Sequence, residues 1–100
     1  MAQVRRIYLG RRMGRITFKL KSSLINQQSV VIITASEGDE ANTTASPARF
    51  VGHAPIGVEN IAPFDGGVIF RIYVIWDEPL PVWADIFIAD ELPRGFIFAR

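Results

Sequence analysis

The sequence predicts an all-β protein: a single-domain antiparallel β-sandwich of seven or eight short strands, with a small β-barrel as the alternative. Three observations lead to this prediction. Apolar and polar residues alternate with a period of two over several short stretches. Turn-forming Gly, Pro and Asp residues separate these stretches at close and fairly regular intervals. No stretch shows the spacing of apolar residues that an amphipathic helix requires.

The length and composition indicate one small domain over residues 1–100, the usual size of a single folding unit. Hydrophobic residues make up 49% of the chain, and the mean hydropathy is positive. A domain of this size leaves a large part of its surface outside the core. We therefore expect some apolar surface to be covered by another subunit or a ligand, and we expect a homo-oligomer.

The sequence carries no feature of an exported or membrane-spanning protein. It has no cysteine, which excludes disulfides and thiolate metal sites. No apolar run is long enough for a spanning helix, and the N-terminus lacks the apolar core of a signal peptide. Residues 1–23 are rich in Arg and free of acids, as transit peptides are, but their period of two indicates strands. We expect a soluble cytoplasmic protein.

The N-terminal part predicts two strands, at residues 3–9 and 15–21, which we expect to form a hairpin around Gly10–Gly14. In this pairing Arg6 lies opposite Lys19. Like charges directly opposite one another destabilise a strand pair, so an anion could lie between them.

The middle of the chain predicts strands at residues 29–36, 48–53 and 56–62, and a last strand is expected at residues 96–99. The first of these contains a continuous run of β-branched residues, which is typical of a strand covered on both faces. Residues 37–48 are small, polar and acidic and show neither period. We expect a mobile loop there.

The stretch Gly66–Asp90, which follows a turn expected at residues 63–67, is the most apolar part of the chain. We expect it to form a central hairpin around the loop at residues 77–81, whose two prolines cannot donate to a ladder. Pairing Trp76 with Val82 would give one wholly apolar face, directed into the core. The residues expected on that inward face are Val68, Phe70, Ile72, Val74, Trp76, Val82, Ala84, Ile86 and Ile88.

The opposite face of this hairpin is the main candidate for function, because folding alone does not require its composition. An ion pair between Arg71 and Asp85 would be framed by aromatic rings, and Trp, Tyr and Arg are enriched at interface hot spots. We expect a dimer interface; the alternatives are a pocket or groove for a small molecule or peptide, and a second core layer under a loop. The face comprises Arg71, Tyr73, Ile75, Trp83, Asp85 and Phe87.

The basic residues are concentrated near the N-terminus and suggest a second candidate, an anion or nucleic-acid patch. Seven of the eleven basic residues lie in the first 21 positions, and the first acid is Glu37. Basic residues interleaved with an aromatic ring are typical of single-strand binders, although a net charge of +1 argues against this function. The other interpretations are a solvated face and a contact with acidic residues of a neighbouring subunit. The candidate patch comprises Arg6, Tyr8, Arg11, Arg12, Arg15, Lys19 and Lys21.

The sequence offers no recognisable catalytic or metal-binding motif. His53 is the only histidine, and it stands near no nucleophile motif and in no metal-ligand spacing. The acidic pairs Asp77-Glu78 and Asp90-Glu91 fall in turns, where neighbouring carboxylates seldom work as acid and base. We expect no catalytic residue, metal or cofactor, and we favour a non-enzymatic protein.

Together these observations predict a self-associating interaction or structural module that is not an enzyme. The alternative is a small-molecule or peptide binder that uses the face containing Arg71, Asp85 and the aromatic residues. A further alternative is nucleic-acid binding through the basic N-terminal hairpin.

Overall fold

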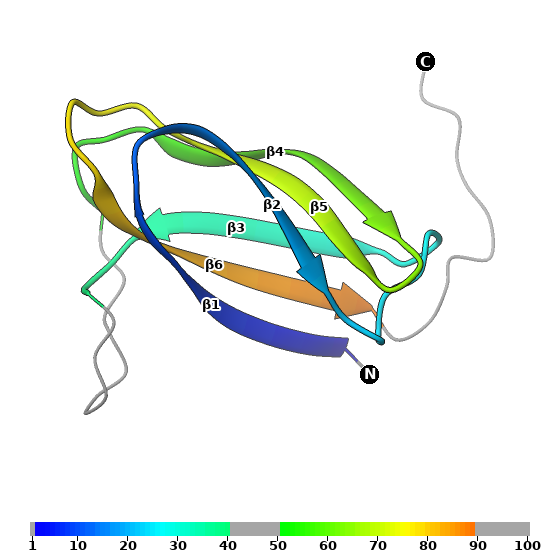
Figure 1. Ribbon diagram of the computed structural model, residues 1–100. Helices are drawn as coiled ribbons and strands as arrows, with labels where there is room; N and C mark the ends of the chain where they lie inside the picture. Colours follow the sequence, from blue (N-terminus) through cyan, green and yellow to red (C-terminus); the bar gives the residue numbers. More distant parts are fainter. Residues whose placement is uncertain (1, 41–50, 90–100) are drawn as a thin grey trace, which may run out of the picture.

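The computed structural model describes residues 2–40 and 51–89, and these form two three-stranded antiparallel sheets packed face to face (Figure 1). Alternating apolar residues give each sheet one face that must be removed from water, and packing the two faces together achieves this. The six strands are β1 (Ala2–Arg12), β2 (Gly14–Lys21), β3 (Val31–Glu37), β4 (Ile56–Phe64), β5 (Gly67–Val74) and β6 (Leu80–Ala89).

Sheet A has the strand order β1-β6-β3, and sheet B has the order β2-β5-β4. The predicted β-sandwich is therefore confirmed, and the described strands do not close into the alternative barrel. Six of the expected strands are present. The strand expected at residues 96–99 lies outside the described residues. For the strand expected at residues 48–53, residues 48–50 also lie outside them. Residues 51–53 belong to no strand.

The hairpin expected from residues 3–9 and 15–21 is wrong, because β1 and β2 belong to different sheets. β1 pairs with β6, whereas β2 pairs with β5. Only Met13 separates the two strands, and the chain reverses direction at this corner while it passes from sheet A to sheet B (Figure 1). Gly10 and Gly14 have φ values of +89° and +81°, and they bend the chain at this corner.

The hairpin expected within Gly66–Asp90 is also wrong, although its inward face is largely correct. β5 and β6 are each the central strand of their own sheet and face one another across the core. Trp76 is the exception to the inward set, because β5 ends at Val74 and Trp76 is exposed. The buried residues from the inward set are Val68, Phe70, Ile72, Val74, Val82, Ala84, Ile86 and Ile88.

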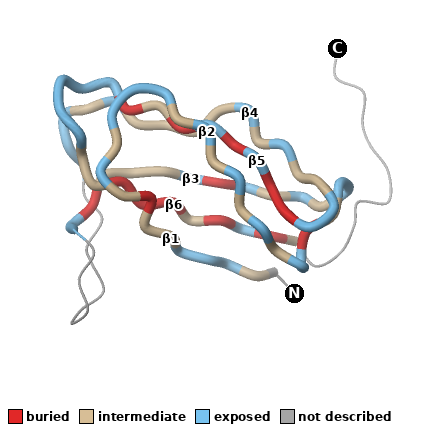
Figure 2. The backbone as a smooth tube through the Cα atoms, viewed as in Figure 1, coloured by how far each residue is buried: buried red, intermediate tan, exposed pale blue. Residues whose placement is uncertain are grey.

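The burial pattern places the core between the two central strands. Figure 2 shows the buried stretches concentrated along β5 and β6, with exposed backbone along the edge strands. Phe70 stacks on Phe18 with ring centroids 5.7 Å apart. Ile25, from the connection after β2, is buried at the end of the core, and its carbonyl accepts a 2.9 Å hydrogen bond from the amide of Gly66. Asp65 and Gly66 form the turn between β4 and β5, so the turn expected at residues 63–67 is present but shorter than expected.

Candidate functional site

The structure distributes the six residues of the main candidate face over two opposite surfaces. Because β5 and β6 face one another across the core, the outward residues of the two strands point in opposite directions. Arg71 and Tyr73 lie on the outer face of sheet B, and Ile75 follows directly after β5. The other three residues lie on the outer face of sheet A. They are Trp83, Asp85 and Phe87.

Strand register arranges the outer face of sheet A into three rows, each with one residue from β1, one from β6 and one from β3. The aromatic row is nearest the β1–β2 corner. The ionic row comes next, and the apolar row is nearest the N-terminus. In this order the rows are Tyr8, Trp83 and Ser36; Arg6, Asp85 and Thr34; and Val4, Phe87 and Ile32.

The ionic row contains an ion pair that differs from the expected one. Arg6 donates from Nε to Oδ1 of Asp85 at 2.9 Å and from Nη2 to Oδ2 at 3.4 Å, the two-pronged geometry that suits a guanidinium and a carboxylate. The hydrogen bond to Asp85, and then the charge of its carboxylate, raise the pKa of Arg6 above its usual value. Arg71, the partner expected for Asp85, donates instead to Oγ1 of Thr17 at 3.4 Å.

The aromatic row is covered by the segment that follows β3. Trp83 is only 8% exposed and packs against Tyr8, with ring centroids 4.8 Å apart. Its Nε1 donates to the carbonyl of Asp39 at 2.8 Å, and the hydroxyl of Tyr8 donates to Oε2 of Glu40 at 2.7 Å. Arg11 also pairs with Glu40. Trp83 therefore belongs to a small second layer of packing and offers little surface to a partner.

The apolar row on the outer face of sheet A is open to solvent. The exposed fraction is 57% for Val4, 52% for Ile32 and 39% for Phe87, and Val30 is exposed at the start of the same face. We call these four residues the apolar patch. The expectation that the run around Val30 and Ile32 is covered on both faces is wrong, because these two side chains, on the outer face of sheet A, are exposed.

The outer face of sheet B is cationic. Arg15 pairs with Glu59 at 3.0 Å, and the ammonium group of Lys19 lies 5.2 Å from the ring centroid of Phe64. Tyr73 lies over Gly57, whose position has no room for a side chain because the ring occupies it. The charged residues that β2, β4 and β5 present on this face are Arg15, Lys19, Lys21, Glu59 and Arg71.

The seven residues of the candidate anion patch do not form one surface. Arg6 and Tyr8 lie on the outer face of sheet A, whereas Arg15, Lys19 and Lys21 lie on the outer face of sheet B. The other two are at the corner between the sheets. Arg11 pairs with Glu40, and Arg12 donates to the carbonyl of Leu9 at 2.7 Å and lies over the ring of Phe18, 5.0 Å from its centroid.

The residues weighed for catalysis or metal binding, His53 and the two acidic pairs, lie at the surface or outside the described residues. His53 is exposed and borders a cavity of about 210 Å³ with Glu37 and Trp76. Residues 2–40 and 51–89 contain no group of three His, Cys, Asp or Glu side chains placed to hold a metal ion. Asp77 and Glu78 are exposed in the β5–β6 connection, and Asp90-Glu91 lies outside the described residues. Of the loop expected at residues 37–48, the structure describes only residues 37–40, and Glu37 belongs to β3 instead of the loop.

Sequence reasoning missed Val4 and Ile32 because they stand outside the central stretch. Only the register of β1 and β3 against β6 brings them beside Phe87. A count of exposed apolar residues on edge strands could have identified them once the partners of β6 were known.

The described residues include no helix that could cross a membrane. The sequence matches no protein-family model, and no curated protein and no solved structure is significantly similar to it. The function must therefore be argued from the geometry of the chain itself.

Proposed function

We propose that the chain is a non-enzymatic interaction module that self-associates through the apolar patch on the outer face of sheet A. The observation that carries this proposal is the row Val4, Phe87 and Ile32, which crosses all three strands of the sheet and stays exposed. Apolar side chains grouped in this way on a small domain are typical of an interaction surface. The polar edge that interfaces usually have would come from the neighbouring ionic row.

The charges on the two outer faces favour a second copy of the chain as the partner. On sheet A, Arg6 pairs with Asp85 and Arg11 pairs with Glu40, so two such faces would meet without net repulsion. The outer face of sheet B carries four cations and one carboxylate, that of Glu59. Two copies of that face would therefore repel one another. A two-fold axis through the patch would bring each Phe87 near the other, because an isologous interface uses the same surface twice.

The alternative functions have less support from the arrangement of their residues. Arg71 and Asp85 lie on opposite outer faces and cannot contribute to one groove. The cations of the N-terminal strands are divided between two faces, and three of them already pair with carboxylates. Neither complete set of candidate residues therefore forms one continuous surface.

Sedimentation velocity on two matched variants tests the proposal. Phe87→Glu places a charge in the apolar patch, and Ile69→Glu places the same charge on the outer face of sheet B. The two positions are equally exposed, at 39% and 38%, and both lie on central strands. We expect the wild type and Ile69→Glu to sediment as dimers and Phe87→Glu as a monomer, because a charge buried against apolar groups is costly.

Circular dichroism on the same samples checks that both variants remain folded. A monomeric wild type at high concentration would contradict the proposal. So would a folded Phe87→Glu variant that associates as strongly as Ile69→Glu.

A further inference from the structure

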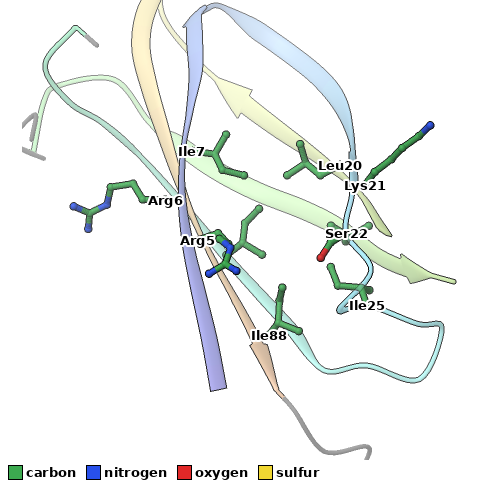
Figure 3. A pocket seen from close by; sticks show the side chains of 10 residues that line it. Arg5, Arg6, Ile7, Leu20, Lys21, Ser22, Ile25 and Ile88 are labelled. Atoms are coloured by element: carbon green, nitrogen blue, oxygen red, sulfur yellow. The ribbon is translucent and has the colours of Figure 1, made fainter. Parts of the chain in front are cut away.

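At the end of the sandwich opposite the β1–β2 corner, a cavity opens between the two sheets. Its volume is about 220 Å³, and it lies between the first residues of β1 and the last residues of β2 (Figure 3). Its floor is part of the hydrophobic core. The apolar side chains that line it are Ile7, Leu20, Ile25, Val68, Ile86 and Ile88.

One cation is directed toward the inner side of the sandwich at the mouth of this cavity. Arg5 lies opposite Ile86 in the β1–β6 register, on the side of β1 that also carries Ile7. Among residues 2–40 and 51–89, its guanidinium donates a long, 3.3 Å hydrogen bond to the carbonyl of Val4, and no carboxylate pairs with it. Figure 3 shows Arg6 and Lys21, which also border the cavity, pointing away from it.

A hydroxyl group faces the cavity from the other side of the mouth. Ser22 follows β2 directly, and Figure 3 shows its side chain directed toward the space between the sheets. The Oγ atom accepts a 3.2 Å hydrogen bond from the amide of Leu24, so its own proton remains available to a ligand. The mouth therefore offers a guanidinium and a hydroxyl donor above an apolar floor.

We propose that this cavity binds a small amphipathic monocarboxylate, such as a medium-chain fatty acid. The hydrocarbon chain would lie between the sheets, and the carboxylate would accept hydrogen bonds from Arg5 and Ser22. The volume suits this class, because a cavity of roughly 150 Å³ accepts one benzene ring, whereas drug-sized ligands need roughly 300 Å³ or more. This site lies inside the sandwich and is independent of self-association through the apolar patch.

An inward-facing charge on an edge strand also discourages strand pairing with other molecules, and Arg5 could serve that purpose without any ligand. That role would not require a cavity with an apolar floor beside the guanidinium. The two roles differ in one measurable property, the affinity for a carboxylate.

Isothermal titration calorimetry with sodium octanoate, 1-octanol and sodium acetate tests the site on the full chain. We expect octanoate to bind, 1-octanol to bind more weakly, and acetate not to bind. Arg5→Gln should lower the affinity for octanoate at least about tenfold and leave that for 1-octanol unchanged, because it removes only the charged partner. Arg71→Gln makes the same change on the outer face of sheet B and should bind octanoate like the wild type.

A second variant tests the hydrocarbon part of the site. Leu20→Phe enlarges a half-buried side chain in the cavity wall. We expect this variant to bind both octanoate and 1-octanol more weakly than the wild type. The proposal is overturned if the wild type does not bind octanoate. It is also overturned if Arg5→Gln binds octanoate as tightly as the wild type, or if a folded Leu20→Phe variant binds both probes unchanged.

Discussion

At the scale of single residues, the two tryptophans of the chain have opposite environments. Trp83 is enclosed by Tyr8 and by the segment after β3, and its indole nitrogen has a fixed partner in the carbonyl of Asp39. Trp76 lies in the β5–β6 connection and is exposed. The aromatic residue that sequence patterning placed at an interface is therefore a structural anchor for residues 38–40.

Replacing each tryptophan by phenylalanine should change the stability of the protein to different extents. Trp83→Phe removes the hydrogen bond to Asp39 and part of the contact with Tyr8, and we expect it to lower the free energy of unfolding by about 1–3 kcal/mol. Trp76→Phe should change the free energy of unfolding by less than about 0.5 kcal/mol, as exposed substitutions usually do. Urea denaturation measures both. Equal losses of stability in the two variants would contradict the assignment of Trp83 as an anchor.

At the scale of elements, three of the four strand pairs join strands that are not consecutive in the sequence, and only β4 and β5 form a hairpin. β5 is paired on one side with β2 and on the other with β4, and β6 is paired with β1 and β3. At Gly67 the backbone of β5 lies close to that of β2. A Cβ atom added there would lie 2.2 Å from the carbonyl oxygen of Leu20, so a side chain would force the two backbones apart.

Gly67→Ala should therefore destabilise the protein by about 1–3 kcal/mol, the usual cost of overpacking. Gly14→Asn is the matched control, because nothing lies within 4 Å of a Cβ atom at Gly14 and asparagine tolerates the positive φ found there. We expect a smaller loss of stability for Gly14→Asn in thermal denaturation. If Gly67→Ala proved the milder change, the close pairing of β2 with β5 would be in doubt.

Sequence patterning predicted most of the strands and most of the core, but not how the strands pair. A period of two identifies which residues share a face, and this correctly grouped Phe70 with Ile72 and Ile86 with Ile88. The pattern does not say whether two apolar faces belong to one sheet or to two sheets packed together. A hairpin and a sandwich bury the same residues, so the choice between them depends on the connections and the remaining strands.

The candidate site depended on that choice and was therefore less predictable. The pattern of its own strand was enough to identify Phe87 as a candidate. Val4 and Ile32 lie beside Phe87 only because of the strand register of sheet A, which the sequence does not show. The period of two places Arg5 on the same face of its strand as Ile7, but the cavity beside it depends on how β1, β2, β5 and β6 are arranged and could not be predicted.

At the scale of the whole molecule, the sandwich has two outer faces of different character. Sheet A presents the apolar patch beside paired charges, and sheet B presents mostly cations. This asymmetry is the basis for proposing that two copies meet through sheet A. In such a dimer the two A sheets would be adjacent and the two B sheets would be outermost, about three sheet spacings of ~10 Å apart.

Double electron–electron resonance between single spin labels measures this arrangement most directly. The chain has no cysteine, so Thr34→Cys on the outer face of sheet A and Thr17→Cys on the outer face of sheet B can each carry one label. We expect intermolecular distances for both, with the Thr34 labels closer together than the Thr17 labels by about 20 Å, or two sheet spacings. Thr17 labels as close as the Thr34 labels, or no intermolecular signal at either position, would contradict self-association through the apolar patch.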